Sequence, residues 1–165
     1  MGQKISFCVW GRPQQRGSKN SFVPLNRKTG EPFRRKNGGV VVSTVDSNKK
    51  SKNWMQQVRS AAAEVFRGDL LQGPIRLSAR FYFKRPASHF GSGKNAGHIK
   101  DSAPLFHTQT PDLSKLLRAL EDGITGVVWL DDRQVYRYDD MTGKYWTTGA
   151  EMTEVIITEI FEAVA

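Results

Sequence analysis

Alternating hydrophobic and polar residues along the chain predict β-strands. The clearest alternation covers residues 75–84, where nearly every second residue is apolar, as in a strand with one buried face. An apolar run rich in aromatic and β-branched residues predicts a first strand over residues 5–11. Shorter stretches of similar composition predict further strands over residues 40–45, 134–138 and 155–161.

Two segments instead repeat their apolar residues with the period of an α-helix. The first is predicted to start with Ser47 as its N-cap and to end near Arg67. The second spans residues 112–124, and its apolar stripe consists of Leu113, Leu116, Leu117, Leu120 and Ile124. Its opposite face carries Ser114, Lys115, Arg118, Glu121 and Asp122. Interspersed strands and helices predict an α+β fold, with a mixed sheet of five or six strands and two main helices. One domain over residues 1–165 is expected for this length.

Two segments show no periodicity. Residues 12–39 are rich in Gly, Pro, Asn, Arg and Lys, and turn-forming residues at 26–30 predict a basic hairpin or flap. Residues 85–110 form a long stretch without regular pattern, and loops of this length are usually functional or disordered.

The composition narrows the class of protein. With 38% hydrophobic and 25% charged residues, the chain is typical of a soluble globular protein. Mean hydropathy is -0.50 and no long apolar run is present, so no membrane span is expected. The absence of a secretory signal pattern predicts a cytoplasmic protein. The single cysteine, Cys8, excludes a disulfide framework, and its place in the first strand predicts burial.

The charge is distributed unevenly along the chain. The formal net charge is +9, but residues 1–60 contain 13 Lys and Arg against 2 acidic residues, whereas residues 61–165 contain 12 against 14. A basic half joined to a mildly acidic half suits a protein that binds a polyanion, and nucleic acid is the favoured partner.

Five acidic residues gather within a short part of this basic protein: Asp112, Glu121, Asp122, Asp131 and Asp132. Carboxylates of this kind suit Mg²⁺, which binds through one or two protein carboxylates together with substrate phosphate. Each residue also has a structural interpretation. Asp112 stands where a helix N-cap is expected, the Asp131–Asp132 pair suits a turn, and Glu121, Asp122 and Arg118 suit an exposed helix face.

The same region carries a recognisable pattern. Residues 111–118 (PDLSKLLR) are followed by residues 129–135 (WLDDRQV). In spacing, helix and turn they resemble the RusA-type Holliday junction resolvases, whose pattern is Pro-Asp-x-Asp-Asn-Leu-x-Lys, a helix, and Trp-x-Asp-Asp-x-Gln-Val. Residues 11–13, 17–19 and 47–54 also resemble segments of phage members of this family.

The resemblance implies a homodimeric, Mg²⁺-dependent endonuclease (with Mn²⁺ as an alternative ion) that cuts four-way DNA junctions in recombination, repair or phage DNA processing. Asp112 and Asp132 match the family's catalytic aspartates, and Arg118 stands where the family has its catalytic Lys. The chain departs from the family at Ser114, which replaces the second Asp, and at Lys115, which replaces Asn.

Glu121 offers a compensation for the acid lost at Ser114, because residues seven apart share a helix face, and Asp122 is the alternative. We therefore expect Asp112, Asp132 and Glu121 to form the metal site. The residues expected to contact DNA phosphates are Arg12, Arg16, Lys19, Arg34, Arg35, Lys36, Lys115 and Lys144. Ser114 leaves open a catalytically impaired protein that only binds branched DNA. A nuclease for other branched DNA and a general nucleic-acid-binding protein are further alternatives.

Three other features of the sequence say less about function. His89, His98 and His107 are too evenly spaced for a typical zinc site and are expected in a DNA-contacting or solvated loop. Trp146 suits either a place near an opened base or the packing of an edge strand. No Gly-rich phosphate loop is present, so no nucleotide cofactor is expected.

Overall fold

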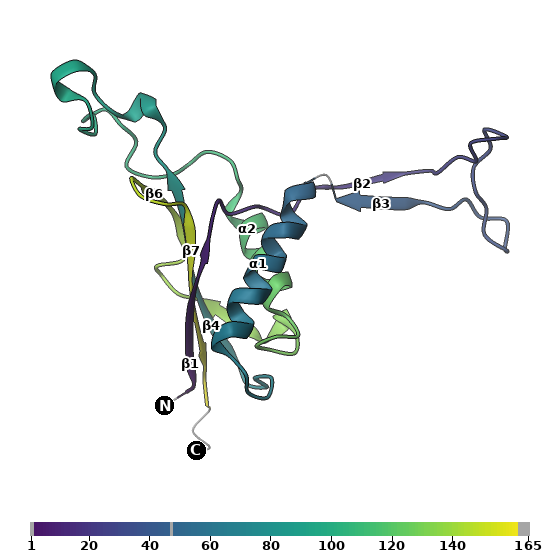
Figure 1. The fold of residues 1–165 in the computed structure, drawn as a ribbon. Coiled ribbons are helices and arrows are strands. Elements are labelled where there is room, and N and C mark those ends of the chain that lie inside the picture. The colour runs from purple at the N-terminus through teal and green to yellow at the C-terminus, as the bar shows by residue number, and fades with distance from the viewer. Residues whose placement is uncertain (1, 47, 162–165) are drawn as a thin grey trace.

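The computed structural model describes residues 2–46 and 48–161. A five-stranded sheet has both long helices on one of its faces (Figure 1), which confirms the predicted α+β fold with a mixed sheet and two main helices. The strands are β1 (Lys4–Trp10), β2 (Lys19–Phe22), β3 (Ser43–Asp46), β4 (Ile75–Lys84), β5 (Val135–Tyr138), β6 (Gly143–Thr147) and β7 (Met152–Glu159). The helices are α1 (Lys49–Val65) and α2 (Leu113–Ile124), with 3-10 turns η1 (Ala87–His89), η2 (Gly93–Asn95) and η3 (Asp132–Gln134).

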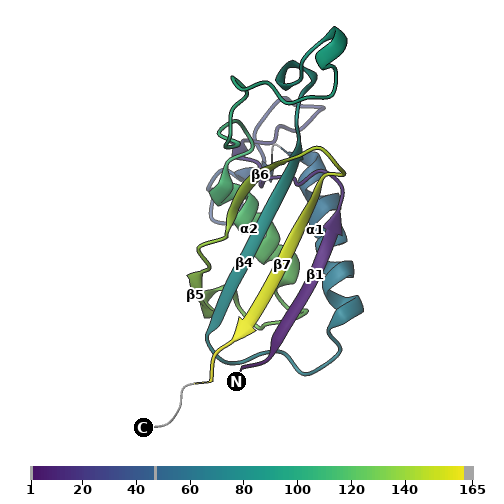
Figure 2. The ribbon, with the colours of Figure 1, turned by 90° about the vertical axis from the view of Figure 1, so that its left-hand side faces the viewer.

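The main sheet mixes antiparallel and parallel pairing. β7 lies between β1 and β4 and is antiparallel to both. β5 and β6 pair in parallel with successive stretches of β4, so they share one edge of the sheet (Figure 2). The sequence did not predict β6, because its lysine, tyrosine and tryptophan show no alternation and all five of its residues are only half-buried.

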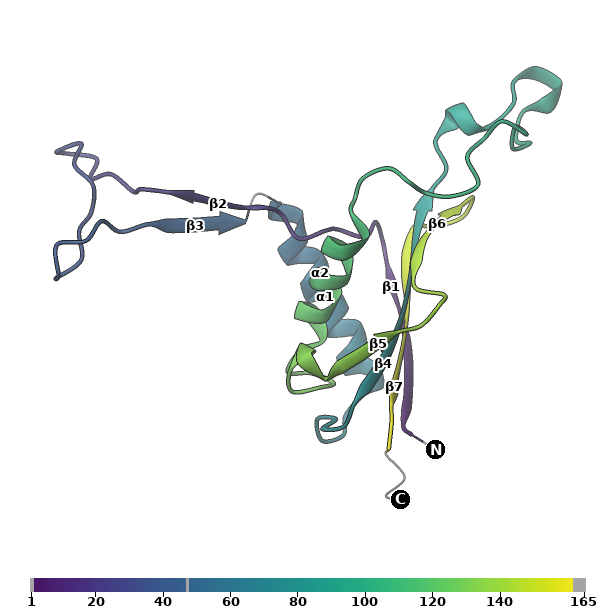
Figure 3. The same cartoon turned by 180° about the vertical axis from the view of Figure 1, so that it is seen from behind.

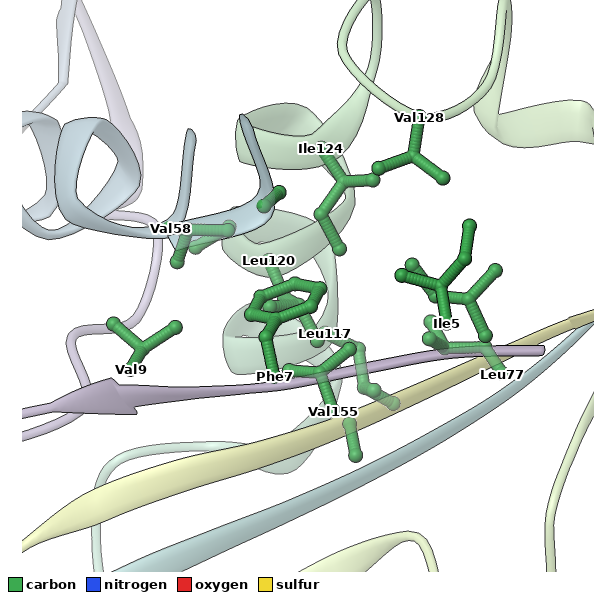
Figure 4. Packing of buried hydrophobic residues seen from close by; sticks show 14 of the residues in the cluster. Ile5, Phe7, Val9, Val58, Leu77, Leu117, Leu120, Ile124, Val128 and Val155 are labelled. Atoms are coloured by element: carbon green, nitrogen blue, oxygen red, sulfur yellow. The ribbon is translucent and has the colours of Figure 1, made fainter. Parts of the chain in front are cut away.

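The core lies between the sheet and the helices (Figure 4). Alternation along β1, β4 and β7 turns one face of each strand toward α1 and α2. The predicted stripe of α2 enters this core, with Leu113 only partly buried. We call the five-stranded sheet with α1 and α2 the body. Each fully buried aliphatic or aromatic side chain stabilises such a core by about 1.5–3 kcal/mol.

The two helices approach each other closely at Gly123. A Cβ atom added to this glycine would lie 2.8 Å from Cγ1 of Val58 on α1. Glycine within a helix usually lowers stability, but here it allows the backbones of α1 and α2 to pack together.

Several predicted boundaries and exposures are wrong. Helix α1 is capped by Asn48, whose Oδ1 accepts from the Lys50 amide, whereas Ser47 lies outside the described residues. β3 starts at Ser43 rather than residue 40, since Val40 forms only an isolated bridge with Arg34. Cys8 is exposed rather than buried, because the alternation of β1 turns it to the sheet face opposite the helices.

Two segments project from the body (Figure 3). The first, which we call the arm, comprises residues 19–46: β2 and β3 pair antiparallel, and the predicted turn at Asn26–Gly30 forms, with the Gly30 amide donating to the Asn26 carbonyl. The second, the loop, comprises residues 85–110 and is folded back on itself by η1, η2 and an isolated bridge between Phe90 and Ile99. Among the described helices, none combines the length and apolar character needed to cross a membrane.

Candidate active site

Asp112 directly precedes helix α2, and its carboxylate does not cap the helix. Its Oδ2 lies 2.9 Å from Nζ of Lys115 on the first turn. The Asp112 amide instead donates to Oε1 of Gln15, at 2.5 Å, so a distant side chain fixes the start of the helix. The bond from Lys115 holds the pKa of Asp112 below its usual value. Asp112 is therefore an exposed, ionised carboxylate rather than the simple helix cap.

The turn η3 separates the roles of two consecutive aspartates. Asp131 accepts from the Arg133 amide and forms a capping box with Gln134. The Gln134 amide group donates to the carbonyls of Leu71 and Gly73, which anchors the turn to the body. Asp131 thus fits the turn interpretation. Asp132 is exposed, and within the described residues its carboxylate makes no hydrogen bond or ion pair.

A cleft of about 640 Å³ lies between α2, η3 and the base of the arm. Its lining residues are Arg16, Gly17, Ser18, Thr44, Lys115, Arg118, Asp122 and Asp132. The Arg16 amide donates to the Lys115 carbonyl, and its Nε lies 2.7 Å from Oδ2 of Asp122, so the chain that enters the arm is tied to α2. Arg118 is exposed, as the solvated-face interpretation required, but it faces a cleft that also holds Asp132.

The expectation that Glu121 lies on an exposed face is wrong. Its side chain is buried, because Tyr138 from β5 packs over it and donates from its hydroxyl to Oε1 at 2.7 Å. Burial raises the pKa of Glu121, and the neighbouring charges of Asp132 and Asp122 raise it further. The same burial, together with the bond to Glu121, raises the pKa of Tyr138. The negative charges of Asp122 and Asp132 thus act electrostatically on the carboxylate of Glu121.

The carboxylates of the site suit a divalent cation that keeps several bound waters better than a cation enclosed by protein ligands. Among the described residues, no three acidic, histidine or cysteine side chains gather around one point. Asp132 and the partly engaged Glu121 nevertheless provide two carboxylates in one electrostatic neighbourhood. Mg²⁺ keeps several waters and usually takes one or two protein carboxylates, so these residues fit such an ion.

The predicted DNA-binding cations occupy three places. Arg16 and Lys115 line the cleft. The arm carries Arg34, Arg35 and Lys36, all exposed, and also Lys19, whose side chain lies outside the described residues. Arg12 lies beside the body, 3.7 Å from a carboxylate oxygen of Glu151.

Lys144 has a contact that the sequence did not suggest. Its Nζ donates to the carbonyls of Gln109, at 2.6 Å, and Pro111, at 2.8 Å. Lys144 therefore ties the end of the loop to the start of α2. A phosphate contact by this residue has to share the ammonium group with these two bonds.

The expectation of a solvated loop is wrong for two of the three histidines. His89 and His107 are buried against Trp146, with ring centroids 4.9 Å and 4.2 Å from the indole, while His98 is exposed. Trp146 thus packs at the edge of the sheet, which agrees with its interpretation as a packing residue of an edge strand.

Three residues of the site were not identified from the sequence. Gln15 positions Asp112, Gln134 holds the Asp131–Asp132 turn, and Tyr138 covers Glu121. Gln134 carried a signal, since it belongs to the quoted turn pattern. Gln15 and Tyr138 carried none, because they reach α2 only through the fold.

Comparison with known proteins yields two similarities. Residues 24–158 match the family described as Endodeoxyribonuclease RusA. A relative from Bacillus subtilis (strain 168), named Uncharacterized protein YqaN, is 23% identical over 156 residues, which cover 94% of this chain and 96% of the relative. The family match includes α2, η3 and most of the arm.

Proposed function

Because this chain belongs to the RusA family of endodeoxyribonucleases, which are hydrolases acting on DNA, we propose that it resolves four-way DNA junctions by paired nicks with the help of Mg²⁺. Its place would be recombination, repair or phage DNA processing inside the cell. The observation that carries the proposal is the cleft that Asp132, whose carboxylate has no bonding partner among the described residues, lines together with the cations Arg16 and Arg118.

Opposite charges in one cleft suit phosphodiester hydrolysis. The cations would hold the scissile phosphate, which a group of carboxylates alone would repel. Arg118 remains protonated at ordinary pH and so does not act as an acid. Its planar group can instead stabilise the charge that develops on the phosphorus oxygens by paired hydrogen bonds. In this role Arg118 substitutes for the family's Lys.

Asp132 and Glu121 would hold the metal ion, whereas the expected third ligand, Asp112, does not gather with them around one point in the described residues. A bound Mg²⁺ supplies an activated water and neutralises charge on the phosphate. Lys115 keeps Asp112 ionised, and Tyr138 orients the buried carboxylate of Glu121 through its hydroxyl. Ser114, which lacks a carboxylate, lies exposed on the first turn of α2 and leaves this set one acid smaller than in the family pattern.

The arm would hold the DNA backbone outside the cleft. The segment between β2 and β3, to which Arg34, Arg35 and Lys36 belong, forms the far end of the arm, away from the body (Figure 1). Symmetric cleavage of a junction needs two active sites, which a two-fold homodimer supplies. We therefore include a homodimer in the proposal.

The test is cleavage of a labelled mobile four-way junction beside a duplex of equal length, with and without Mg²⁺ or Mn²⁺. Paired, symmetric nicks in the junction alone are the expected result. Tight, salt-sensitive junction binding without nicks in either metal would contradict catalysis and favour the impaired binding protein that Ser114 suggests. Preferred cutting of flaps or forks in competition would favour a nuclease for other branched DNA.

A further inference from the structure

A second pocket lies where the loop meets the end of the sheet. It has a volume of about 360 Å³, which falls within the range of small-ligand sites. The end of β4, strand β6, the segment after β1 and the end of the loop all contribute to its walls. We propose that this pocket captures one deoxynucleotide that is extruded from a duplex arm of the substrate at the branch point. The inference rests on the proposed action on branched DNA.

The walls of the pocket combine an apolar side with polar groups. Pro86 and the half-buried Trp146 provide the accessible part of the apolar side, since Phe83 is almost fully buried, and this part suits the flat face of a base. Gln109 and Thr110 bring an amide and a hydroxyl that can pair with base edges. The mixture of an apolar wall and a few polar groups is typical of sites that select small ligands.

Two ring nitrogens at the pocket lack ordinary partners. Within the described residues, Nε1 of Trp146 is buried with no hydrogen-bond partner, and Nδ1 of His107 has none beyond the backbone of its own residue. Buried polar groups left unpaired are costly, so each calls for an explanation such as a bound water, an ion or a functional role. The two rings are held firmly, because His107 packs between Phe83 and Trp146.

Cations at the rim suit the phosphate of the same nucleotide. Arg12, Lys84 and Arg85 line the pocket, against the single carboxylate of Glu151. Arg85 is already engaged, since it donates to the Pro104 carbonyl and lies over the Trp146 ring. Lys84 is exposed, and among the described residues its ammonium group has no partner. Lys84 is therefore the cation best placed to meet a phosphate.

The pocket is connected directly to the active site. Gln109 and Thr110 in its wall precede Asp112 by only a few residues, and Lys144 holds the carbonyls on both sides of Thr110. Lys144 also acts electrostatically on both His107 and Asp112. A nucleotide in the pocket would thus neighbour the phosphate in the cleft.

The pocket also gives a physical reason for selecting branched DNA. A base inside a stacked duplex cannot enter a pocket of this shape without being extruded, and extrusion costs less where stacking is already broken. The bases of a four-way junction are all paired, but those at the branch point lack the continuous stacking of an intact duplex. Capture of one nucleotide would therefore favour junctions over duplex.

The direct test follows the indole N–H signals of the full-length, ¹⁵N-labelled protein during addition of single-stranded trinucleotides, one for each base, without metal. We expect the Trp146 signal, assigned with Trp146→Phe, to shift saturably and to respond more strongly to one base than to the others. Lys84→Gln should weaken this binding about fivefold, as loss of one phosphate contact implies. Lys4→Gln, a matched exposed cation at the other end of the sheet, should leave it unchanged.

The outcomes separate this inference from the proposed function. A Trp146 signal that does not shift with any trinucleotide would rule out nucleotide binding in the pocket, even if junctions are cleaved normally. A shift of equal size with a blunt duplex at the same concentration would overturn it as well. A saturable Trp146 shift in a protein that cuts no junction would support the pocket and contradict the proposed function. Gln109→Ala, at an exposed position that should not disturb folding, should lower the ratio of junction to duplex cleavage, and an unchanged ratio would count against the pocket.

Discussion

The body buries its apolar side chains between one sheet and two helices, whereas the arm exposes most of its own. Seven large apolar side chains of the arm are exposed: Phe22, Val23, Leu25, Phe33, Val40, Val42 and Val45. A two-stranded hairpin of this kind is at best marginally stable in water. Its conformation is therefore open to change by whatever it contacts, while the geometry of the body is set by its own core.

This difference corresponds to a division of labour. The cleft with Asp132 and Arg118 is built on α2 and η3, both anchored to the core of the body. Rigid elements of this kind can hold catalytic groups in place. The exposed cations of the arm can follow a DNA backbone without disturbing those groups. We accordingly expect the arm to affect binding and the body to determine the rate of cutting.

The largest effect is expected in the cleft. Asp132→Asn should lower Mg²⁺-dependent junction cleavage by about a hundredfold or more, as does loss of a group that stabilises the transition state. The melting temperature should not change, because Asp132 is exposed and unpaired within the described residues. Junction binding should survive. Asp140→Asn, another exposed acid, is the control. Cleavage by Asp132→Asn at the wild-type rate would rule out its catalytic role.

The second effect concerns the arm. Replacement of Arg34, Arg35 and Lys36 by Gln should weaken junction binding by roughly 10- to 100-fold at moderate salt. The slope of log affinity against log salt should fall by up to about three, since each lost phosphate contact removes roughly one unit. Filter binding at several salt concentrations measures both. An unchanged slope would place these residues away from the DNA.

A third comparison uses one glycine from each region. Gly123→Ala should lower the free energy of unfolding by about 1–3 kcal/mol, because the new methyl group meets Val58 and has little room. Gly30 in the arm has φ of +73° and open space around it, so Gly30→Ala strains only a local turn. Denaturant unfolding should leave its midpoint unchanged. A large shift for Gly30→Ala would show that the arm and the body unfold together.

The smallest effect is a pH dependence from the base of the loop. Burial, with the nearby cation Lys144, lowers the pKa of His107 in the folded protein. Stability from neutral His107 is thus present above its unfolded pKa, about 6.5, and is lost as pH falls toward the lower folded pKa. One proton limits the slope to about 1.4 kcal/mol per pH unit. His107→Gln should make the melting temperature depend less on pH between pH 7 and 5. If the variant and the wild type show the same dependence, His107 is not its source.

The sequence predicted much of the body and the outline of the site. Alternation in β4 and the apolar stripe of α2 indicated elements that the core confirms, because burial of one face dictates such patterns. The turn at Asp131–Asp132 followed from residue types. By contrast, β6 has no clear pattern, since its residues are only half-buried at an edge.

The contacts made across the fold were beyond sequence reasoning. Burial of Glu121 depends on Tyr138 arriving from β5, and the support of Asp112 depends on Gln15, 97 residues away. Helical period placed Glu121 on a polar face, but it could not reveal that another strand covers that face. The pocket at Trp146 likewise arises from segments that meet only in the folded chain.

The most direct test of this division is the single-turnover cleavage rate on a pre-bound four-way junction, at saturating protein and with Mg²⁺. It should be measured for the wild type, for Asp132→Asn and for the arm variant in which Gln replaces Arg34, Arg35 and Lys36. We predict that Asp132→Asn binds the junction but does not cut it, while the arm variant cuts at the wild-type rate once saturated. An arm variant that stays slow at saturation, or an Asp132→Asn protein that no longer binds, would contradict the account.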